Sequence, residues 1–362
     1  MKRNFVILLL LFVLFLTQGL DAQSRKYVDA RQLNIEGQLF ENLPNVWHRI
    51  DTSVYKGFTS KELRQMLYSA GKIVFFRTDS RNITIRPTYG AMRGSISAVT
   101  DVAMGGFDLY IKENGGWRWG GMACPSRDEK TSVSKLRTNM KAGMKECMLF
   151  CPLFSELVSL EIGVDADAVI EPLATPFRHR ILFHGSSFTH GYSCSRPGMT
   201  YPFQFMRKTS LLVLNLGCSG NCKMQPYYAD FLENIEADAY VFDAFSNPLG
   251  PTIRKRLPEF VERMVKAHPG KPIIFQQTIY REARAFNQEI DEREQEKMDV
   301  AEELMAELCA KYQDVYFIVP NAADEEHDTS VDGIHPNDKG YGIWAESIRV
   351  PLLNILKKYG VK

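Results

Sequence analysis

The sequence has 362 residues, of which 45% are hydrophobic, and its 44 basic and 43 acidic residues give a formal net charge of +1. This length suggests two domains, and the apolar fraction is enough for each of them to bury a core. The balanced charge excludes a nucleic acid or an anionic membrane surface as the principal partner.

Residues 1–22 have the pattern of a secretory signal peptide. Two basic residues, Lys2 and Arg3, precede an apolar run at 5–15, and a small residue, Ala22, ends the segment. The run is too short to span a bilayer comfortably as a mature anchor, and no cysteine near the cleavage point is available for lipid attachment. We therefore expect export to the periplasm or the extracellular space, with no stable membrane span after cleavage. A retained membrane anchor is the alternative.

From residue 23 to residue 175, short β-like runs are separated by glycine-containing turns. Apolar and polar residues alternate at close spacing in these runs, which predicts an all-β, jelly-roll-like sandwich domain. Residues 60–69 form one short predicted helix, with Ser60 as a candidate N-cap. Trp117 and Trp119 are compatible with a sugar-stacking platform, but their alternation favours core or domain-interface positions. The clearest strands are 72–77, 82–86, 107–111 and 157–162.

The cysteines and histidines do not indicate a metal site. An oxidising compartment permits a disulfide among Cys194, Cys218 and Cys222, although the sequence does not choose the pair. The C-x3-C spacings lack the paired histidines of a zinc site. His184 and His190 flank a short turn at a spacing that fits packing or substrate contact better than metal ligation.

From residue 176 to residue 362 the pattern changes, because strand-like runs alternate with helical segments. Such alternation predicts parallel strands joined by crossover helices, and hence a three-layer α/β/α domain of the flavodoxin-like type. The predicted strands are 181–183, 211–216, 239–245, 273–276 and 315–318, and the predicted helices are 201–208, 227–233, 252–266, 286–311 and 339–357.

The first of these strands ends in Gly185-Ser186-Ser187, which alone is best explained as a tight turn between strand and helix. Ligands of open α/β sheets bind at the carboxyl ends of the strands, however, and a hydroxyl is presented there. A serine becomes a nucleophile when a histidine accepts its proton and an acidic residue orients that histidine. Asp332 and His335, on one loop before the last helix, supply such a pair.

The tetrahedral intermediate of acyl transfer also needs fixed hydrogen-bond donors for its oxyanion. The backbone N–H groups of Ser187 and Gly220 and the side-chain amide of Asn247 are the candidates, since each follows one of the first three strands. Two of these candidates have a simpler alternative: Gly220 as a tight turn, and Asn247 as the cap of the following helix.

These blocks resemble the SGNH hydrolases of the GDSL esterase/lipase superfamily, over residues 178–357. By position, Ser187 is similar to the family's nucleophile, Gly220 and Asn247 to its oxyanion donors, and Asp332 and His335 to its Asp-x-x-His block. Two departures stand out: Gly-Asp-Ser is Gly-Ser-Ser here, and only the asparagine of Gly-x-Asn-Asp is kept. An exported bacterial subgroup has an extra N-terminal β-domain with a Gly-x-Asp-Leu-Tyr motif, which residues 106–110 match.

The resemblance implies an exported serine esterase that works through an acyl-enzyme intermediate without cofactor or metal. Export and the appended β-domain make removal of short acyl groups, such as acetyl, from glycans or oligosaccharides the leading interpretation. A lipase or aryl-esterase acting on lipid or small-molecule esters is the alternative. The missing aspartate of Gly-Asp-Ser also keeps open a catalytically inactive glycan-binding protein.

Overall fold

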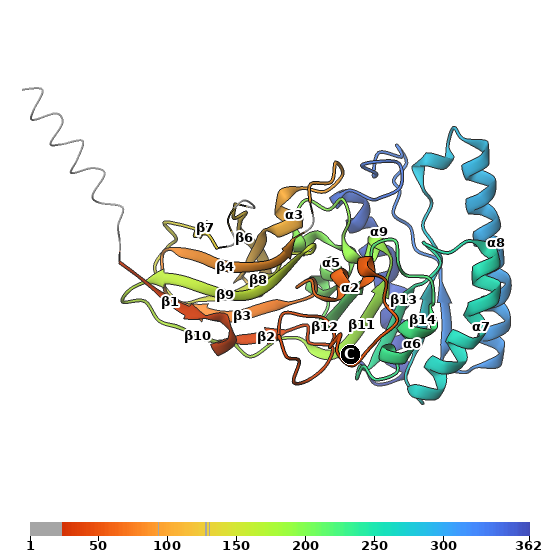
Figure 1. Ribbon diagram of the computed structural model, residues 1–362, viewed down its shortest axis with the longest axis horizontal. Coiled ribbons are helices and arrows are strands. Elements are labelled where there is room, and N and C mark those ends of the chain that lie inside the picture. The colour runs from red at the N-terminus through yellow and green to blue at the C-terminus, as the bar shows by residue number, and fades with distance from the viewer. Residues whose placement is uncertain (1–23, 93, 127–128, 130) are drawn as a thin grey trace, which may run out of the picture.

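The computed structural model describes residues 24–362 except 93, 127–128 and 130. The predicted signal peptide therefore lies outside the described residues. Antiparallel sheets form the N-terminal half of the described chain, and a parallel sheet flanked by helices forms the C-terminal half (Figure 1). Within the described part of the chain, no helix is both long and apolar enough to cross a membrane.

The N-terminal half is the predicted β-sandwich, because two antiparallel sheets enclose a shared apolar core. One sheet has the order β1-β9-β4-β7, and the other has the order β10-β3-β8-β5-β6, with β2 also paired to β3. Inward side chains alternate with outward ones along the strands. The strands are β1 (Arg25–Asp29), β2 (Asn34–Glu36), β3 (Ile73–Thr78), β4 (Ile83–Met92), β5 (Phe107–Glu113), β6 (Gly116–Ala123), β7 (Ser134–Arg137), β8 (Lys145–Phe150), β9 (Ser155–Asp165) and β10 (Ile170–Pro172).

The C-terminal half contains five parallel strands in the order β12-β11-β13-β14-β15. This is the flavodoxin-like order, in which the second strand lies outside the first and the chain then continues in the other direction. The strands are β11 (Arg178–Gly185), β12 (Leu211–Gly217), β13 (Ala239–Asp243), β14 (Ile273–Gln276) and β15 (Val315–Ile318). The helices are α4 (Ser187–His190), α5 (Tyr201–Lys208), α6 (Pro226–Leu232), α7 (Gly250–Ala267), α8 (Gln288–Lys311) and α9 (Asp338–Lys358).

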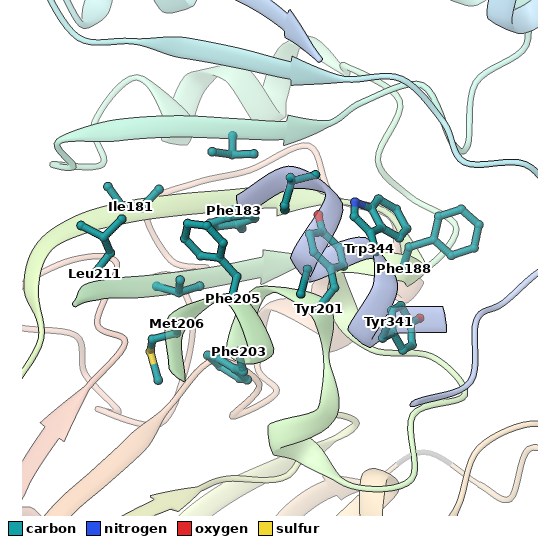
Figure 2. Close-up of a cluster of buried hydrophobic side chains, with 14 of the residues drawn as sticks. Ile181, Phe183, Phe188, Tyr201, Phe203, Phe205, Met206, Leu211, Tyr341 and Trp344 are labelled. Carbon is teal, nitrogen blue, oxygen red and sulfur yellow. The ribbon is translucent and has the colours of Figure 1, made fainter. Parts of the chain in front are cut away.

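Alternate residues of each parallel strand enter two different cores, one on each face of the sheet. Phe183 faces α5 and α9, whereas its neighbour Leu182 faces α6, α7 and α8. Figure 2 shows the first core, where the Tyr201 and Trp344 rings stack with centroids 4.2 Å apart. This core continues into the β-sandwich, since the rings of Phe150 in β8 and Phe203 in α5 pack with their centroids 4.7 Å apart.

Residues 37–72, here called the α2 segment, leave the β-sandwich between β2 and β3 and pack on the C-terminal half. Leu39, Ile50 and Met66 belong to the core that covers the α6–α8 face of the parallel sheet. The segment contains α2 (Ser60–Met66), which lies between the two halves (Figure 1). Its N-cap is Thr59 and not Ser60 as predicted, because the Thr59 hydroxyl and the Glu62 carboxylate form a capping box.

The Gly-x-Asp-Leu-Tyr motif connects the two halves on another side. Asp108 of β5 is fully buried, and its carboxylate accepts hydrogen bonds from the Gly198 N–H (3.0 Å), Arg196 Nε (3.2 Å) and Trp119 Nε1 (3.1 Å). Burial raises the pKa of Asp108 to about 6, although Arg196 and the Gly198 N–H oppose that rise. The motif thus fixes the loop before α5 to the sandwich.

The interface interpretation of Trp117 is confirmed, since its ring stacks on Phe177 at the start of the C-terminal half, with centroids 6.4 Å apart. Trp119 is not a core residue: its side chain is 49% exposed and lies under Arg196.

The permitted disulfide is not formed, because Cys194, Cys218 and Cys222 are all free thiols. Each thiol has its own hydrogen-bond acceptor in a buried position: the carbonyl oxygens of Arg196, Leu216 and Asp243, respectively.

Candidate active site

The turn at residues 185–187 is held in place by the neighbouring strand β13. Gly185 lies opposite Asp243 of β13, and a Cβ at Gly185 would lie 2.6 Å from the Asp243 Cβ, so a larger residue has no room. The buried Asp243 carboxylate accepts hydrogen bonds from the Ser186 N–H (3.0 Å), the Ser186 hydroxyl (2.6 Å) and the Thr189 hydroxyl (3.1 Å). Ser186 Oγ also caps α4. Its hydrogen-bonding capacity is therefore used by the fold.

This network extends into the core beneath the turn. Thr189 Oγ1 lies 3.0 Å from the Tyr201 hydroxyl, which accepts a hydrogen bond from Gln276 Nε2, and Gln276 Oε1 accepts one from Trp344 Nε1 (2.8 Å). All these groups are buried, so each polar atom depends on its partner. The turn is consequently held by β13, β14 and both helices of this face.

Ser187, His335 and Asp332 form a continuous hydrogen-bonded chain. Ser187 Oγ lies 2.9 Å from His335 Nε2, and His335 Nδ1 lies 2.8 Å from Asp332 Oδ2. The other carboxylate oxygen of Asp332 accepts the backbone N–H groups of His335 (2.8 Å) and Ile334 (3.0 Å). The ionised Asp332 holds the proton of His335 on Nδ1, which leaves Nε2 to accept the serine proton.

The surroundings of His335 favour the neutral imidazole over the charged form. Burial lowers its pKa below the ordinary 6.5, while Asp332 opposes that change and Arg281 adds to it. Burial by itself would raise the pKa of Asp332, but the hydrogen bonds from His335 and Ile334 outweigh it and the pKa is lowered. The Tyr192 ring lies 4.2 Å from the His335 ring, and the Tyr341 hydroxyl donates to the Tyr192 carbonyl (2.6 Å).

The predicted oxyanion donors lie around the same pocket as Ser187 and His335. Asn247 Oδ1 accepts the Cys222 N–H at 3.1 Å, so the amide is turned with its NH2 group available for a substrate oxygen. Gly220 is exposed and has a φ of +72°, a conformation that glycine adopts without strain. Ser187 is the first residue of α4, where the backbone N–H has no intrahelical partner.

The pocket has a volume of about 360 Å³ and two walls of different origin. One wall comes from the ends of the parallel strands and from the loop before α9. The other comes from the β-sandwich side, through α2 and the residues that follow it. The full lining is Lys61, Arg64, Gln65, Tyr68, Ser187, Phe188, Tyr192, Ser219, Gly220, Asn247, Arg281, Ile334 and His335.

The α2 segment also supports the loop that carries Gly220. Gln65 Nε2 donates to the Ser219 carbonyl (3.0 Å), and the buried Arg49 donates through Nη1 to the Gly217 carbonyl (2.6 Å). These two hydrogen bonds hold the backbone that leads into Gly220 and restrict its movement. Residues far earlier in the chain thus hold a candidate oxyanion donor in place.

The other histidines lie outside the hydrogen-bonded chain. His184 is buried and its Nδ1 lies 2.9 Å from the Leu216 carbonyl, and burial lowers its pKa to about 4. His190 is buried with its ring stacked on Phe154 (4.3 Å). Both are packing residues. Across the described residues, no group of three or more His, Cys, Asp or Glu side chains is arranged to hold a metal ion.

Comparisons with known proteins agree with this architecture. The model of the GDSL-like Lipase/Acylhydrolase family matches residues 178–352, and a second model, the N-terminus of Esterase_SGNH_hydro-type proteins, matches residues 25–170. A crystal structure of a GDSL-like lipase from Bacteroides ovatus is 35% identical, with a TM-score of 0.88, covering 92% of this chain and 98% of that one.

The chain belongs to the GDSL-like lipase/acylhydrolase family.

More distant members of this fold differ in their chemistry. The salicylyl-acyltransferase SsfX3 of a tetracycline biosynthetic pathway is 19% identical, with a TM-score of 0.72, covering 94% of this GDSL-like chain and 100% of its own. A family two carbohydrate esterase from Cellvibrio japonicus is 11% identical, with a TM-score of 0.59 and coverage of 92% and 98%. No curated protein sequence is similar enough to match the chain.

Proposed function

We propose that this acylhydrolase is an exported serine esterase that removes short acyl groups, chiefly acetyl, from carbohydrates. The observation on which this depends is the Ser187–His335–Asp332 chain, with distances of 2.9 Å and 2.8 Å, beside three candidate oxyanion donors. The geometry also argues against an inactive glycan-binding protein, because every group needed for acyl transfer is assembled.

In the proposed mechanism, Ser187 Oγ attacks the ester carbonyl carbon while His335 Nε2 takes the serine proton. The N–H groups of Ser187 and Gly220 and the Asn247 amide stabilise the oxyanion. Collapse of the intermediate breaks the bond to the sugar oxygen, which takes the proton from His335. Water then attacks the acyl-enzyme and gives its proton to His335. The bond between the acyl carbon and Ser187 Oγ breaks, the serine oxygen takes the proton back from His335, and the free acid leaves.

The carbohydrate part of the proposal is supported by the pocket and by the fold's neighbours. Most of the described residues that line the pocket carry a polar or charged group, and only Phe188 and Ile334 among them have pure hydrocarbon side chains. Structures of this fold include family two carbohydrate esterases, one of them in complex with cellohexaose, and an acetyl xylan esterase from Butyrivibrio proteoclasticus.

The test is acetate release from a panel of acetylated oligosaccharides, beside p-nitrophenyl esters of increasing chain length. We expect acetate release from at least one glycan and a steep decline in rate beyond short acyl chains. The Ser187→Ala variant controls for background hydrolysis. Preference for long-chain esters without release from any glycan would instead support the lipase alternative.

We also propose that the protein is exported, on the basis of the signal-peptide pattern at 1–22. Cell fractionation followed by N-terminal sequencing of the mature protein tests this. We expect the mature chain outside the cytoplasm with Gln23 as its first residue. A cytoplasmic protein that keeps Met1 or its neighbours would contradict the proposal.

A further inference from the structure

The charge of the pocket lining is one-sided. Its described residues include the cations Lys61, Arg64 and Arg281, and no carboxylate. The chain as a whole has 44 basic and 43 acidic residues, so a general excess of positive charge does not explain this composition. A pocket with one sign of charge concentrates ligands of the opposite sign.

Two of these cations belong to one face of α2. Lys61, Arg64 and Gln65 are spaced at i, i+3 and i+4, which places them along the same side of α2, and Tyr68 lies two residues after the helix ends at Met66. Gln65 and Tyr68 are buried, whereas Lys61 and Arg64 are exposed. The face therefore has a fixed inner part against the Ser219 loop and a cationic outer part at the rim.

The carboxylate of the same helix is turned away from the pocket. Glu62 is buried and accepts hydrogen bonds from Gln225 Nε2 and the Tyr227 hydroxyl, each at 3.0 Å, as well as from the Thr59 N–H (2.8 Å). These contacts fix the rotation of α2. The charge of Glu62 is taken up by these donors and not by Lys61 or Arg64.

The cations of the α2 face are unpaired within the described part of the chain, where neither the Lys61 nor the Arg64 side chain makes an ion pair. Arg281, on the opposite wall, is anchored by Glu294 (3.3 Å) and by the Ser246 carbonyl, and its buried Nε has no partner there. The charge of Arg281 is thus balanced by Glu294, whereas Lys61 and Arg64 line the same pocket without a carboxylate partner and are placed to receive an anion.

We infer that the preferred substrate is an acylated sugar that carries an anionic group, a carboxylate or a sulfate, on its alcohol part. Lys61 and Arg64 are then specificity-determining residues. This rests on the proposed function, since an acetyl group fills only a small part of a 360 Å³ pocket and leaves the α2 wall to the sugar. Arginine binds carboxylate or sulfate oxygens in pairs, and lysine adds a second charge.

The anion lies away from the reacting carbonyl in this arrangement. Its contacts are therefore made equally in the ground state and in the transition state, and they act mainly on KM. The attraction between a partly exposed pair of charges is also screened by salt. An effect that appears in KM and weakens with salt is therefore distinguishable from a general loss of folding or of catalysis.

The experiment compares acetate release from three oligosaccharides of equal length: acetylated galacturonate, acetylated sulfated galactose and acetylated neutral galactose. The proteins are the wild type, Lys61→Gln, Arg64→Gln, the double variant, and Lys255→Gln as a control at an exposed position of α7. The double variant should lose roughly 10- to 100-fold of the wild type's preference for an anionic over the neutral substrate, through KM. The Lys255→Gln ratio should equal that of the wild type.

A second measurement varies the salt concentration. Wild-type kcat/KM on the anionic substrates should fall between low and high salt, and the neutral substrate should show no such change. A preference for the uronate identifies a carboxylate as the anion, and a preference for the sulfated sugar identifies a sulfate. Equal rates on neutral and anionic glycans, unchanged by the double substitution, would overturn the inference while leaving the esterase intact. Failure on all three glycans, with p-nitrophenyl acetate hydrolysed, would instead overturn the proposed carbohydrate substrate and this inference with it.

Discussion

The two walls of the pocket differ in how they are built. The wall formed by the parallel strands is supported by a buried hydrogen-bonded network that runs from Asp243 through Tyr201 to Trp344. The wall formed by α2 is anchored from behind but presents exposed, unpaired cations to the pocket. The first arrangement holds reacting groups at fixed distances, and the second leaves long side chains able to adapt to a ligand. Chemistry and selectivity are thus assigned to different parts of the chain.

The largest effect should come from removing the nucleophile on the strand wall. Ser187→Ala should lower kcat on p-nitrophenyl acetate by roughly 10⁴- to 10⁶-fold, because no other group takes over the covalent step. Steady-state kinetics and the mass of a trapped acetyl-enzyme measure this. Ser186→Ala is the matched control, which should form the acyl-enzyme while losing about 1–3 kcal/mol of unfolding free energy. The opposite pattern would assign the reaction to Ser186.

A smaller effect is expected at the oxyanion donors of the same wall. Asn247→Ala should lower kcat by roughly 10²- to 10³-fold, with little change in KM. Asn247→Asp keeps an acceptor for the Cys222 N–H but removes the donor, so it should be at least as inactive while folding normally. An active Asn247→Asp enzyme would show that this side chain only caps its turn.

The pH dependence tests the environment of His335. The neutral imidazole is the active form, and burial lowers its pKa below 6.5. Activity should therefore be constant at neutral pH and fall about tenfold per pH unit on the acidic side, with a midpoint below 6.5. A midpoint above 6.5 in the kcat/KM profile would show that the charged form is favoured, contrary to the structure.

The mildest expected effect probes the place where the α2 wall supports the catalytic wall. Gln65→Met removes the hydrogen bond to the Ser219 carbonyl at similar side-chain size, and it should lower kcat about tenfold through displacement of Gly220. A purely structural role would lower the melting temperature and leave the kcat of the folded enzyme unchanged. The Lys61→Gln and Arg64→Gln effects on KM complete the comparison, since they concern selectivity alone.

Much of the strand wall could be predicted from the sequence, because its residues follow apolar runs whose carboxyl ends meet at one edge. Ser187, Asp332 and His335 come together as expected, and the five strands lie close to their predicted positions. Asp243 was missed, although a carboxylate directly after the buried run 239–242 is the same kind of signal as Gly185-Ser186-Ser187 after β11. Without the sheet order, nothing in the sequence places it beside that turn.

The α2 wall could not be predicted, since it depends on contacts between distant segments. The sequence predicts a helix over residues 60–69, and the structure has one at Ser60–Met66, but its partners lie about 150 residues further along the chain, as with Gln65 and Ser219. A local pattern determines helix formation, not the surface on which the helix packs. The departure from Gly-Asp-Ser has a physical reason here: an aspartate at 186 would place a second carboxylate against Asp243, which Ser186 instead satisfies as a donor.

The path of the α2 segment has a consequence for the order in which the protein folds. The ribosome completes residues 37–72 early, yet the apolar side chains of Leu39, Ile50 and Met66 have their partners in a core formed by residues up to 315. During synthesis this surface stays uncovered until nearly the whole chain has emerged. The α2 segment therefore reaches its native contacts only with the second half, whereas the core of the sandwich uses residues 28–170 alone and does not depend on that half.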